Sequence, residues 1–478
     1  MVFSSLSFLF FFLPITLAVN FILPKKARNY WLLIASLVFY AWGAHSFVIV
    51  MIISIAMNYV LARLIVWGKQ ADKSLAFQRT FLVLALIGNL GILFYNKYMN
   101  FFTEQLSRIF GDSVVVTNII LPIGISFFTF QAISYVVDVY RGDAAVQKNP
   151  FYLGLYISFF PQLIAGPIVR YRTIADQITD RSVTLEKFAV GVRRFCIGFA
   201  MKVLIANQMS IIADAAFGLS GNPASLSVGF AWLGALAYSL QIFFDFAGYS
   251  SMAIGLGKMF GFDFLENFNF PYISKTVTEF WRRWHMSLGQ WFRDYVYIPL
   301  GGSRVDKKYK LVRNLFIVWV LTGVWHGANW TFIAWGLGYF VLLTIEKLTN
   351  LPKRKMVLGV RILYQIFTLL CVMVGWVVFR SDGIRDAFRY MGSMLGRTGN
   401  VLIDNNAIRY ANDYKILIVI AVVCCTPALV KLQSWLEKKL HAEAAVNFVF
   451  NILILGLLVI SVSYLVMGGN NPFIYFNF

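Results

Sequence analysis

Two histidines, His285 and His326, are the residues of this chain whose type and setting best suit chemistry. An imidazole has an ordinary pKa near 6.5 and can take or give a proton at neutral pH. His326 lies in "TGVWHGANW", between two tryptophans and long apolar runs. An ionisable group in apolar surroundings is costly and usually faces an interior cavity. Tryptophans beside a membrane also serve as simple anchors. The pattern alone therefore leaves open a functional site and an aromatic anchor.

His285 belongs to a second unusual segment, residues 271–300, which is bracketed by Pro271 and Pro299. Helical periodicity predicts one continuous amphipathic helix here. Its apolar stripe consists of Trp281, Trp284, His285, Leu288, Phe292 and Tyr295, and its polar residues are Arg282, Arg283, Ser287, Gln290, Arg293 and Asp294. Such a helix is typical of one lying on the cytoplasmic headgroups of a membrane. A histidine on the apolar stripe is compatible with a catalyst and with a hydrogen-bonded core residue.

The elements that must position these histidines are membrane helices. The chain has 478 residues, of which 59% are hydrophobic and 13% charged. Soluble domains are about 45–50% apolar and about 25% charged. Apolar runs of about 20 residues, the length that spans a bilayer, recur along the whole sequence. The sequence therefore predicts an all-α polytopic membrane protein that forms a single domain over residues 1–478.

Hydropathy predicts about 11–12 transmembrane helices. The predicted spans are residues 6–23, 30–44, 47–66, 80–95, 119–139, 195–217, 225–247, 312–325, 328–346, 359–379, 414–430 and 446–467. Gly and Pro interrupt two shorter apolar stretches, 151–168 and 252–265. We predict re-entrant or half-spanning pieces there, since irregular backbone at membrane depth requires cover by protein or a cavity.

Basic loops predict the orientation. The basic segments are residues 25–29, 68–79, 170–172, 303–313 and 346–355. All of them can be cytoplasmic if both termini and the loop 380–413 are extracytoplasmic. The N-terminal segment lacks a basic region and a cleavage site, so it is predicted to be a retained first span. These loops carry most of the net charge of +20. Nucleic-acid binding is not expected, whereas an anionic cytoplasmic substrate is compatible with the charge.

Several catalytic patterns are missing from the sequence. There is no GxSxG, no Walker A motif and no histidine followed four residues later by aspartate. The four histidines include no pair spaced for a metal on one helix, and the four cysteines form no CxxC motif, so no metal site is expected.

The segments "EFWRRWHMSLGQWFRDYVYIPLGGSR" and "LTGVWHGANWTFIAWG" resemble the membrane-bound O-acyltransferase (MBOAT) family. The likeness extends to "LPIGISFFTFQAISYVVDVYRG", "FFPQLIAGPIVR", "FFDFAGYSSMAIGLGKMFGF" and the ending "NPFIYFNF". These segments are most similar to the bacterial branch that includes the membrane subunit for alginate O-acetylation. The resemblance covers essentially the whole chain.

The resemblance implies an MBOAT fold, in which re-entrant and interfacial helices surround a central tunnel. It also implies catalytic roles for His326, which matches the family's near-invariant histidine, and for His285. It implies acetyl-CoA as a cytoplasmic donor substrate, with no permanently bound cofactor. The acetyl group would pass across the bacterial inner membrane to an exported polysaccharide, through an extracytoplasmic acetyltransferase partner protein.

The mechanism expected from the resemblance gives His326 the role of general base or of acetyl acceptor. His285 would orient the thioester carbonyl or donate a hydrogen bond to the oxyanion. Residues expected to line the tunnel or bind coenzyme A are Trp281, Arg282, Arg283, Trp284, Gln290, Arg293, Asp294, Arg304, Trp325 and Asn329. Asp138 and Asp245 are carboxylates within apolar segments. They either support the site or make structural hydrogen bonds between helices.

Two other classes of function remain open. The chain could transfer another acyl group, such as D-alanine to teichoic acid, or acylate a lipid or protein. The second class is a transporter that catalyses no reaction. Few acidic residues lie in the predicted spans, so there are few carboxylates that could form a proton relay.

Overall fold

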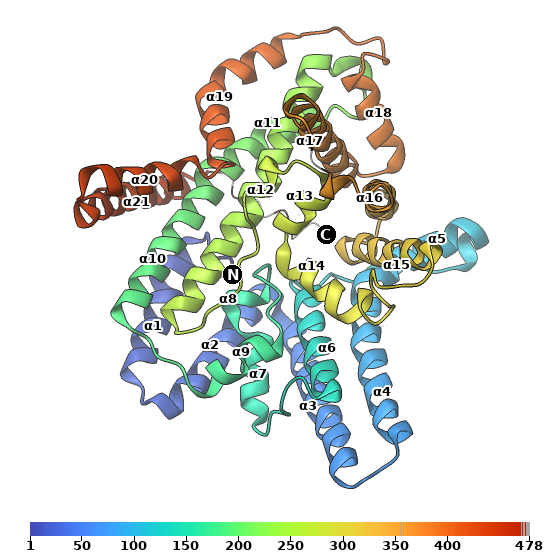
Figure 1. Cartoon of the computed structure of the whole chain (residues 1–478), viewed down its shortest axis with the longest axis vertical. Coiled ribbons are helices and arrows are strands. Elements are labelled where there is room, and N and C mark those ends of the chain that lie inside the picture. The colour runs from blue at the N-terminus through green and yellow to red at the C-terminus, as the bar shows by residue number, and fades with distance from the viewer. Residues whose placement is uncertain (355, 470, 472–473, 475–478) are drawn as a thin grey trace. The chain divides into compact units, whose positions relative to one another are not determined.

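The computed structural model describes residues 1–354, 356–469, 471 and 474, and this part of the chain contains helices and no β-strand (Figure 1). It divides into two compact units. The first contains residues 1–195 and 249–265, and the second contains residues 196–248 and 266–478. The single transmembrane domain over residues 1–478 stays a prediction.

Seven helical stretches are long and apolar enough to cross a membrane among the residues described. They are Lys25–Gln70, Leu75–Phe110, Leu185–Phe217, Val228–Met259, Trp330–Leu348, Leu358–Arg380 and Glu443–Val466. An eighth forms if Asn405–Cys424 and Ala428–Leu440, which meet at 70°, count as one span. This architecture confirms the all-α polytopic class. The predicted spans 6–23, 119–139 and 312–325 also fall on helices, but these helices are shorter or more charged than the seven.

The first unit is built from helices near the N-terminus. Its helices are α1 (Leu13–Ile22), α2 (Lys25–Ala44), α3 (Val48–Gln70), α4 (Leu75–Leu93), α5 (Met99–Phe110), α6 (Ile125–Arg141), α7 (Pro150–Ser158), α8 (Phe160–Leu163) and α9 (Tyr171–Thr179). The aromatic rings of Phe3, Phe8, Phe39 and Phe160 pack in its core. Residues 151–168 form short, broken, buried helices, as predicted from their Gly and Pro.

The prediction of a separate piece at residues 252–265 is wrong for residues 252–259, because α12 runs without a break over Val228–Met259. The glycines there permit close packing and do not interrupt the helix. A Cβ added at Gly255 would lie 2.6 Å from the carbonyl oxygen of Gly191 in α10 (Leu185–Ala200). In the second unit, a Cβ at Gly248 would lie 2.7 Å from the carbonyl oxygen of Gly198. The two backbones therefore touch where a side chain would separate them.

The second unit contains both histidines. Its other helices are α11 (Asn207–Phe217), α13 (Val277–Arg283), α14 (Met286–Phe292), α15 (Lys308–His326), α16 (Trp330–Leu348), α17 (Leu358–Arg380), α18 (Ile384–Met394), α19 (Asn405–Cys424), α20 (Ala428–Leu440) and α21 (Glu443–Val466). Most of the quoted ending "NPFIYFNF" lies outside the described residues. Helices α13 to α16 follow one another in the sequence and position the histidines (Figure 1).

Candidate active site

His326 is the last residue of α15, and α16 begins at Trp330. The predicted spans 312–325 and 328–346 leave only a short turn between them, and the structure confirms this turn. The Asn329 side chain ends the turn by accepting a hydrogen bond from the Thr331 N–H at 3.1 Å. Gly327 is required in this turn because a Cβ there would overlap the ring of Phe332. The turn thus holds the His326 imidazole at the end of a rigid helix.

Aromatic rings enclose His326, which is buried. Its ring centre lies 4.9 Å from Trp325, 5.0 Å from Trp335 and 5.2 Å from Phe379. The two flanking tryptophans differ, since Trp325 is buried and Trp330 is half exposed. Trp325 therefore forms a wall of the site, whereas Trp330 has the exposure of an anchor.

The chain breaks at His285, so the prediction of one continuous helix over residues 271–300 is wrong. His285 adopts the left-handed conformation (φ 44°, ψ 53°) between α13 and α14. Two backbone hydrogen bonds impose the break, from the Asn269 N–H to the Arg283 oxygen and from the Met286 N–H to the Asn267 oxygen, both at 2.9 Å. Residues 267–269 therefore end the helix before His285, and helical periodicity within residues 271–300 does not include them.

The Asn267 side chain fixes the His285 ring. Its Oδ1 lies 3.1 Å from Nδ1 of His285 and accepts hydrogen bonds from the Ser287 hydroxyl at 2.8 Å and the Ser287 N–H at 3.2 Å. The Ser287 N–H can only donate, so the Asn267 atom is an oxygen and Nδ1 of His285 must carry the proton. Burial lowers the pKa of His285 to about 3. The imidazole is therefore neutral, with its lone pair on Nε2.

One indole lies between the two histidines. The Trp325 ring centre is 5.8 Å from that of His285 and 4.9 Å from that of His326. The second unit thus brings together two imidazoles that are 41 positions apart in the sequence and belong to different helical segments.

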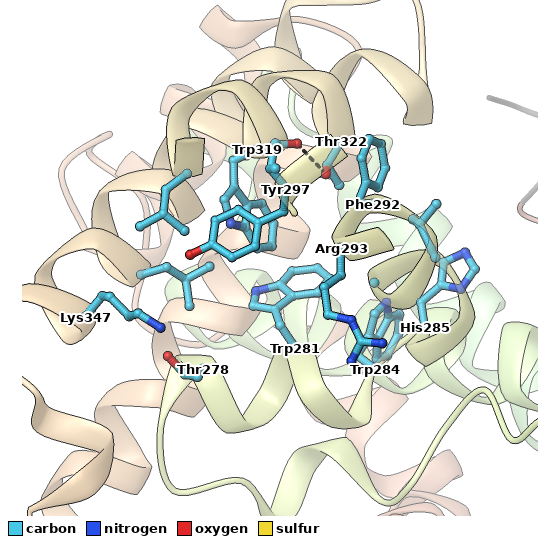
Figure 2. Close-up of a pocket in the computed structure, with 15 residues that line it drawn as sticks. Thr278, Trp281, Trp284, His285, Phe292, Arg293, Tyr297, Trp319, Thr322 and Lys347 are labelled. Carbon is cyan, nitrogen blue, oxygen red and sulfur yellow. Dashed lines mark hydrogen bonds between the residues drawn. The ribbon is translucent and has the colours of Figure 1, made fainter. Parts of the chain in front are cut away.

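A cavity of about 250 Å³ lies beside His285 (Figure 2). Aromatic and aliphatic side chains form most of its wall, including Trp281, Trp284 and Trp319. Figure 2 shows the Lys347 ammonium and the Thr278 hydroxyl on one side of Trp281, and Arg293 and His285 on the other. His326 is not among the lining residues. The cavity can therefore hold an apolar chain with a cation at each side, and His285 is the histidine among its lining residues.

Only three of the ten residues expected to bind substrate line this cavity: Trp281, Trp284 and Arg293. The guanidinium of Arg283 is held by Glu279 at 2.9 Å, and buried Asp294 pairs with Arg293 at 2.8 Å. The others, Arg282, Gln290, Arg304, Trp325 and Asn329, lie elsewhere. Arg282 and Arg304 are exposed.

The two candidate carboxylates are placed differently. Asp245 in α12 forms a buried ion pair with Lys202, whose Nζ lies 2.7 Å from Oδ1, and its Oδ2 accepts a hydrogen bond from the Ile474 N–H at 2.8 Å. These contacts are structural links between segments of the second unit. Asp138 is buried in α6 of the first unit. Within the described residues, no three His, Cys, Asp or Glu side chains meet as a metal site.

Sequence reasoning missed Glu346, a buried carboxylate in α16. It accepts hydrogen bonds from the N–H groups of Val277 and Thr278 at 2.8 and 2.7 Å, and from the Tyr364 hydroxyl at 2.8 Å. A negative charge at these N–H groups stabilises the first turn of α13. Glu346 thereby positions the helix that carries Trp281. Its lone acidic charge at the end of an apolar span could have identified it.

We expect Glu346→Gln to lower the thermal unfolding midpoint of the detergent-solubilised protein by several degrees. Hydrogen bonds to a charged group stabilise by about 1.5–3 kcal/mol each, and the neutral amide weakens three of them. The matched control is Glu443→Gln, in the first turn of α21, where the side chain is exposed. Equal midpoints for the two variants would show that Glu346 does not hold α13.

Comparison with known proteins agrees with this geometry. Residues 144–381 match the membrane-bound O-acyltransferase family. The chain is 46% identical to a probable alginate O-acetylase of Azotobacter vinelandii over 413 residues, which cover 85% of this chain and 80% of that protein. It is 40% identical to a probable alginate O-acetylase of Pseudomonas putida over the full length of both. It is 36% identical to a peptidoglycan O-acetyltransferase of Helicobacter pylori, over 84% of this chain and 80% of that protein.

These relatives share most of their length with the chain, including the segments that carry both histidines and the cavity. The chain therefore belongs to the membrane-bound O-acyltransferase family and is a membrane O-acyltransferase.

Proposed function

We propose that this protein moves acetyl groups from cytoplasmic acetyl-CoA across the bacterial inner membrane, for O-acetylation of an exported polysaccharide by an extracytoplasmic partner. The names of the relatives support acetyl as the group and a cell-surface polysaccharide as the acceptor, since they include alginate and peptidoglycan O-acetylation. The single structural observation that carries the proposal is the apolar cavity lined in part by the neutral imidazole of His285, with one indole in contact with both this ring and that of His326.

The cavity suits an acyl thioester. Its apolar wall matches a pantetheine arm, and Arg293 or Lys347 can pair with phosphate groups at its edge. The basic loop over residues 303–313 supports a cytoplasmic mouth, and the extracytoplasmic termini follow from the same rule. A thioester is already activated, so the transfer needs no nucleotide hydrolysis.

His326 takes the proton from the acceptor hydroxyl while the oxygen attacks the thioester carbonyl, and the proton then passes to the leaving thiolate of coenzyme A. In the alternative route, the His326 imidazole attacks the thioester and the coenzyme A thiolate leaves; the acceptor hydroxyl then attacks the acetyl-imidazole, which frees His326, and the hydroxyl proton passes to the thiolate. The expected role of His285 changes in one respect. With Nδ1–H bound to Asn267, its Nε2 accepts a hydrogen bond, so His285 orients an N–H or O–H group of a substrate and does not donate to the oxyanion.

We expect His326→Ala to reduce acetyl release from acetyl-CoA by on the order of 10²–10⁴-fold, the usual contribution of a general base. The assay follows labelled acetyl leaving coenzyme A in the presence of purified protein, with size-exclusion chromatography to confirm folding. The control is His441→Asn, because His441 is exposed and also left-handed, a conformation that asparagine tolerates. Near-normal activity in folded His326→Ala would exclude this mechanism. Longer acyl-CoA and D-alanyl carrier protein, tested in competition, would reveal a different donor.

We expect Asn267→Asp to move the acid limb of the kcat/KM profile to higher pH, by roughly one unit or more. A carboxylate beside Nδ1 stabilises the imidazolium and raises the pKa of His285. The neutral form that the reaction needs is then lost at a higher pH as the solution is acidified. His285→Asn should abolish this shift and retain the left-handed backbone. An unchanged profile in Asn267→Asp would mean that the proton on His285 plays no part.

A further inference from the structure

A second cavity, of about 150 Å³ and polar in character, lies in the first unit, far from the histidines in sequence. The turn between α1 and α2 forms one side, and residues 178–183 after α9 form the other. Four basic side chains line it: Lys25, Lys26, Arg28 and Arg181. The carboxylate among its lining residues is Asp180, which is exposed. The cavity therefore has an excess of positive charge.

None of these four cations has an ion-pair partner in the described part of the chain. Arg181 is held by oxygens of uncharged groups, since Nε donates to the Phe260 carbonyl at 3.0 Å and Nη1 donates to Asn29 Oδ1 at 2.6 Å. Its guanidinium also lies 4.4 Å from the Phe262 ring centre. Burial and the nearby Arg28 lower the pKa of Arg181 to about 10, so the group stays charged at neutral pH. A partly buried, unneutralised charge is costly, and an anion would offset that cost.

The start of α2 adds to this positive potential. Lys25 and Lys26 are its first two residues, and its first turn contains no acidic residue. A helix N-terminus has a partial positive charge and favours anions, so lysines there are unfavourable for the helix alone. The first turn of α2 therefore gains stability from an anion that the chain does not supply.

A buried amide also faces this cavity without a partner. Asn20 is 2% exposed and lines the cavity, and its Oδ1 is buried without a hydrogen-bond partner among the residues described. A buried polar group normally has a hydrogen-bond partner. The Oδ1 can accept a hydrogen bond from a headgroup hydroxyl, and Nδ2 of the same carboxamide can donate one to a phosphate oxygen. The unpartnered amide and the unpaired cations thus indicate the same kind of ligand.

We propose that this cavity binds the phosphate group of an anionic phospholipid. The lipid source is favoured by the apolar surface beside it, where Phe21 and Ile22 are 41% and 82% exposed and α2 enters an apolar span. A phosphate in the cavity places acyl chains along these residues, and basic pockets between membrane helices bind lipid headgroups in this way. The positive-inside rule explains lysines at this end of a span, but it does not explain a buried amide or a cavity.

The test is lipid retention by the purified full-length protein, measured by native mass spectrometry after incubation in mixed micelles of phosphatidylglycerol and phosphatidylcholine. We expect selective retention of phosphatidylglycerol, and a roughly tenfold loss in the double variant Lys25→Gln and Lys26→Gln. Both lysines are exposed, so the fold should persist, as circular dichroism would verify. The matched control removes two exposed charges away from the cavity, Lys73→Gln and Arg79→Gln.

Equal losses in the two double variants, or equal retention of the two lipids, would overturn the proposal. A free phosphate site would also overturn it. In that case millimolar inorganic phosphate would raise the unfolding midpoint, the effect would vanish in Lys25→Gln and Lys26→Gln, and lipid retention would be unchanged. Acetyl transfer is not a readout here, so failure of this inference leaves the proposed activity untouched.

Discussion

The position of His285 depends on one side-chain oxygen, Oδ1 of Asn267. It binds both the imidazole Nδ1 and the two donors of Ser287, and the Asn267 backbone holds Met286. These bonds end α13, start α14 and fix the imidazole of His285, which is one of the residues that line the cavity. They also select the His285 tautomer that carries its proton on Nδ1. One asparagine therefore decides where the ring lies and which of its nitrogens carries the proton.

Buried charge organises the rest of the second unit. Glu346 accepts hydrogen bonds from helix N–H groups and a tyrosine, and Lys202 forms an ion pair with Asp245. Removing one partner of such a pair is more damaging than replacing both, because an isolated charge remains in a medium of low polarity. The first unit differs at the start of α2, where the basic side chains that line the cavity have no acidic ion-pair partner among the described residues. The charges of the second unit therefore stabilise the fold, whereas we assign those at the start of α2 to ligand binding.

Local patterns were sufficient for the features that depend on local sequence. The apolar runs predicted a helical membrane protein, and the short gap between the predicted spans 312–325 and 328–346 predicted the turn after His326. Failures came from contacts distant in sequence. Periodicity over residues 271–300 could not include the pairing with residues 267–269 that breaks the helix at His285. Gly255 was taken for an interruption because a sequence does not show that another backbone, at Gly191, requires the space. The cavity itself, lined by residues of the four helices α13 to α16, could not be predicted from local pattern either.

The concentration of indoles in the second unit has an optical consequence. Trp281, Trp319 and Trp335 have ring centres within about 6 Å of one another, and Trp376 stacks on the same group. Two of these four, Trp281 and Trp319, line the cavity. Excitation energy passes readily between indoles at such separations, so emission from this group reflects its most quenched member. The native protein, with 13 tryptophans and no added dye, therefore contains a fluorescent reporter of what enters the cavity beside His285.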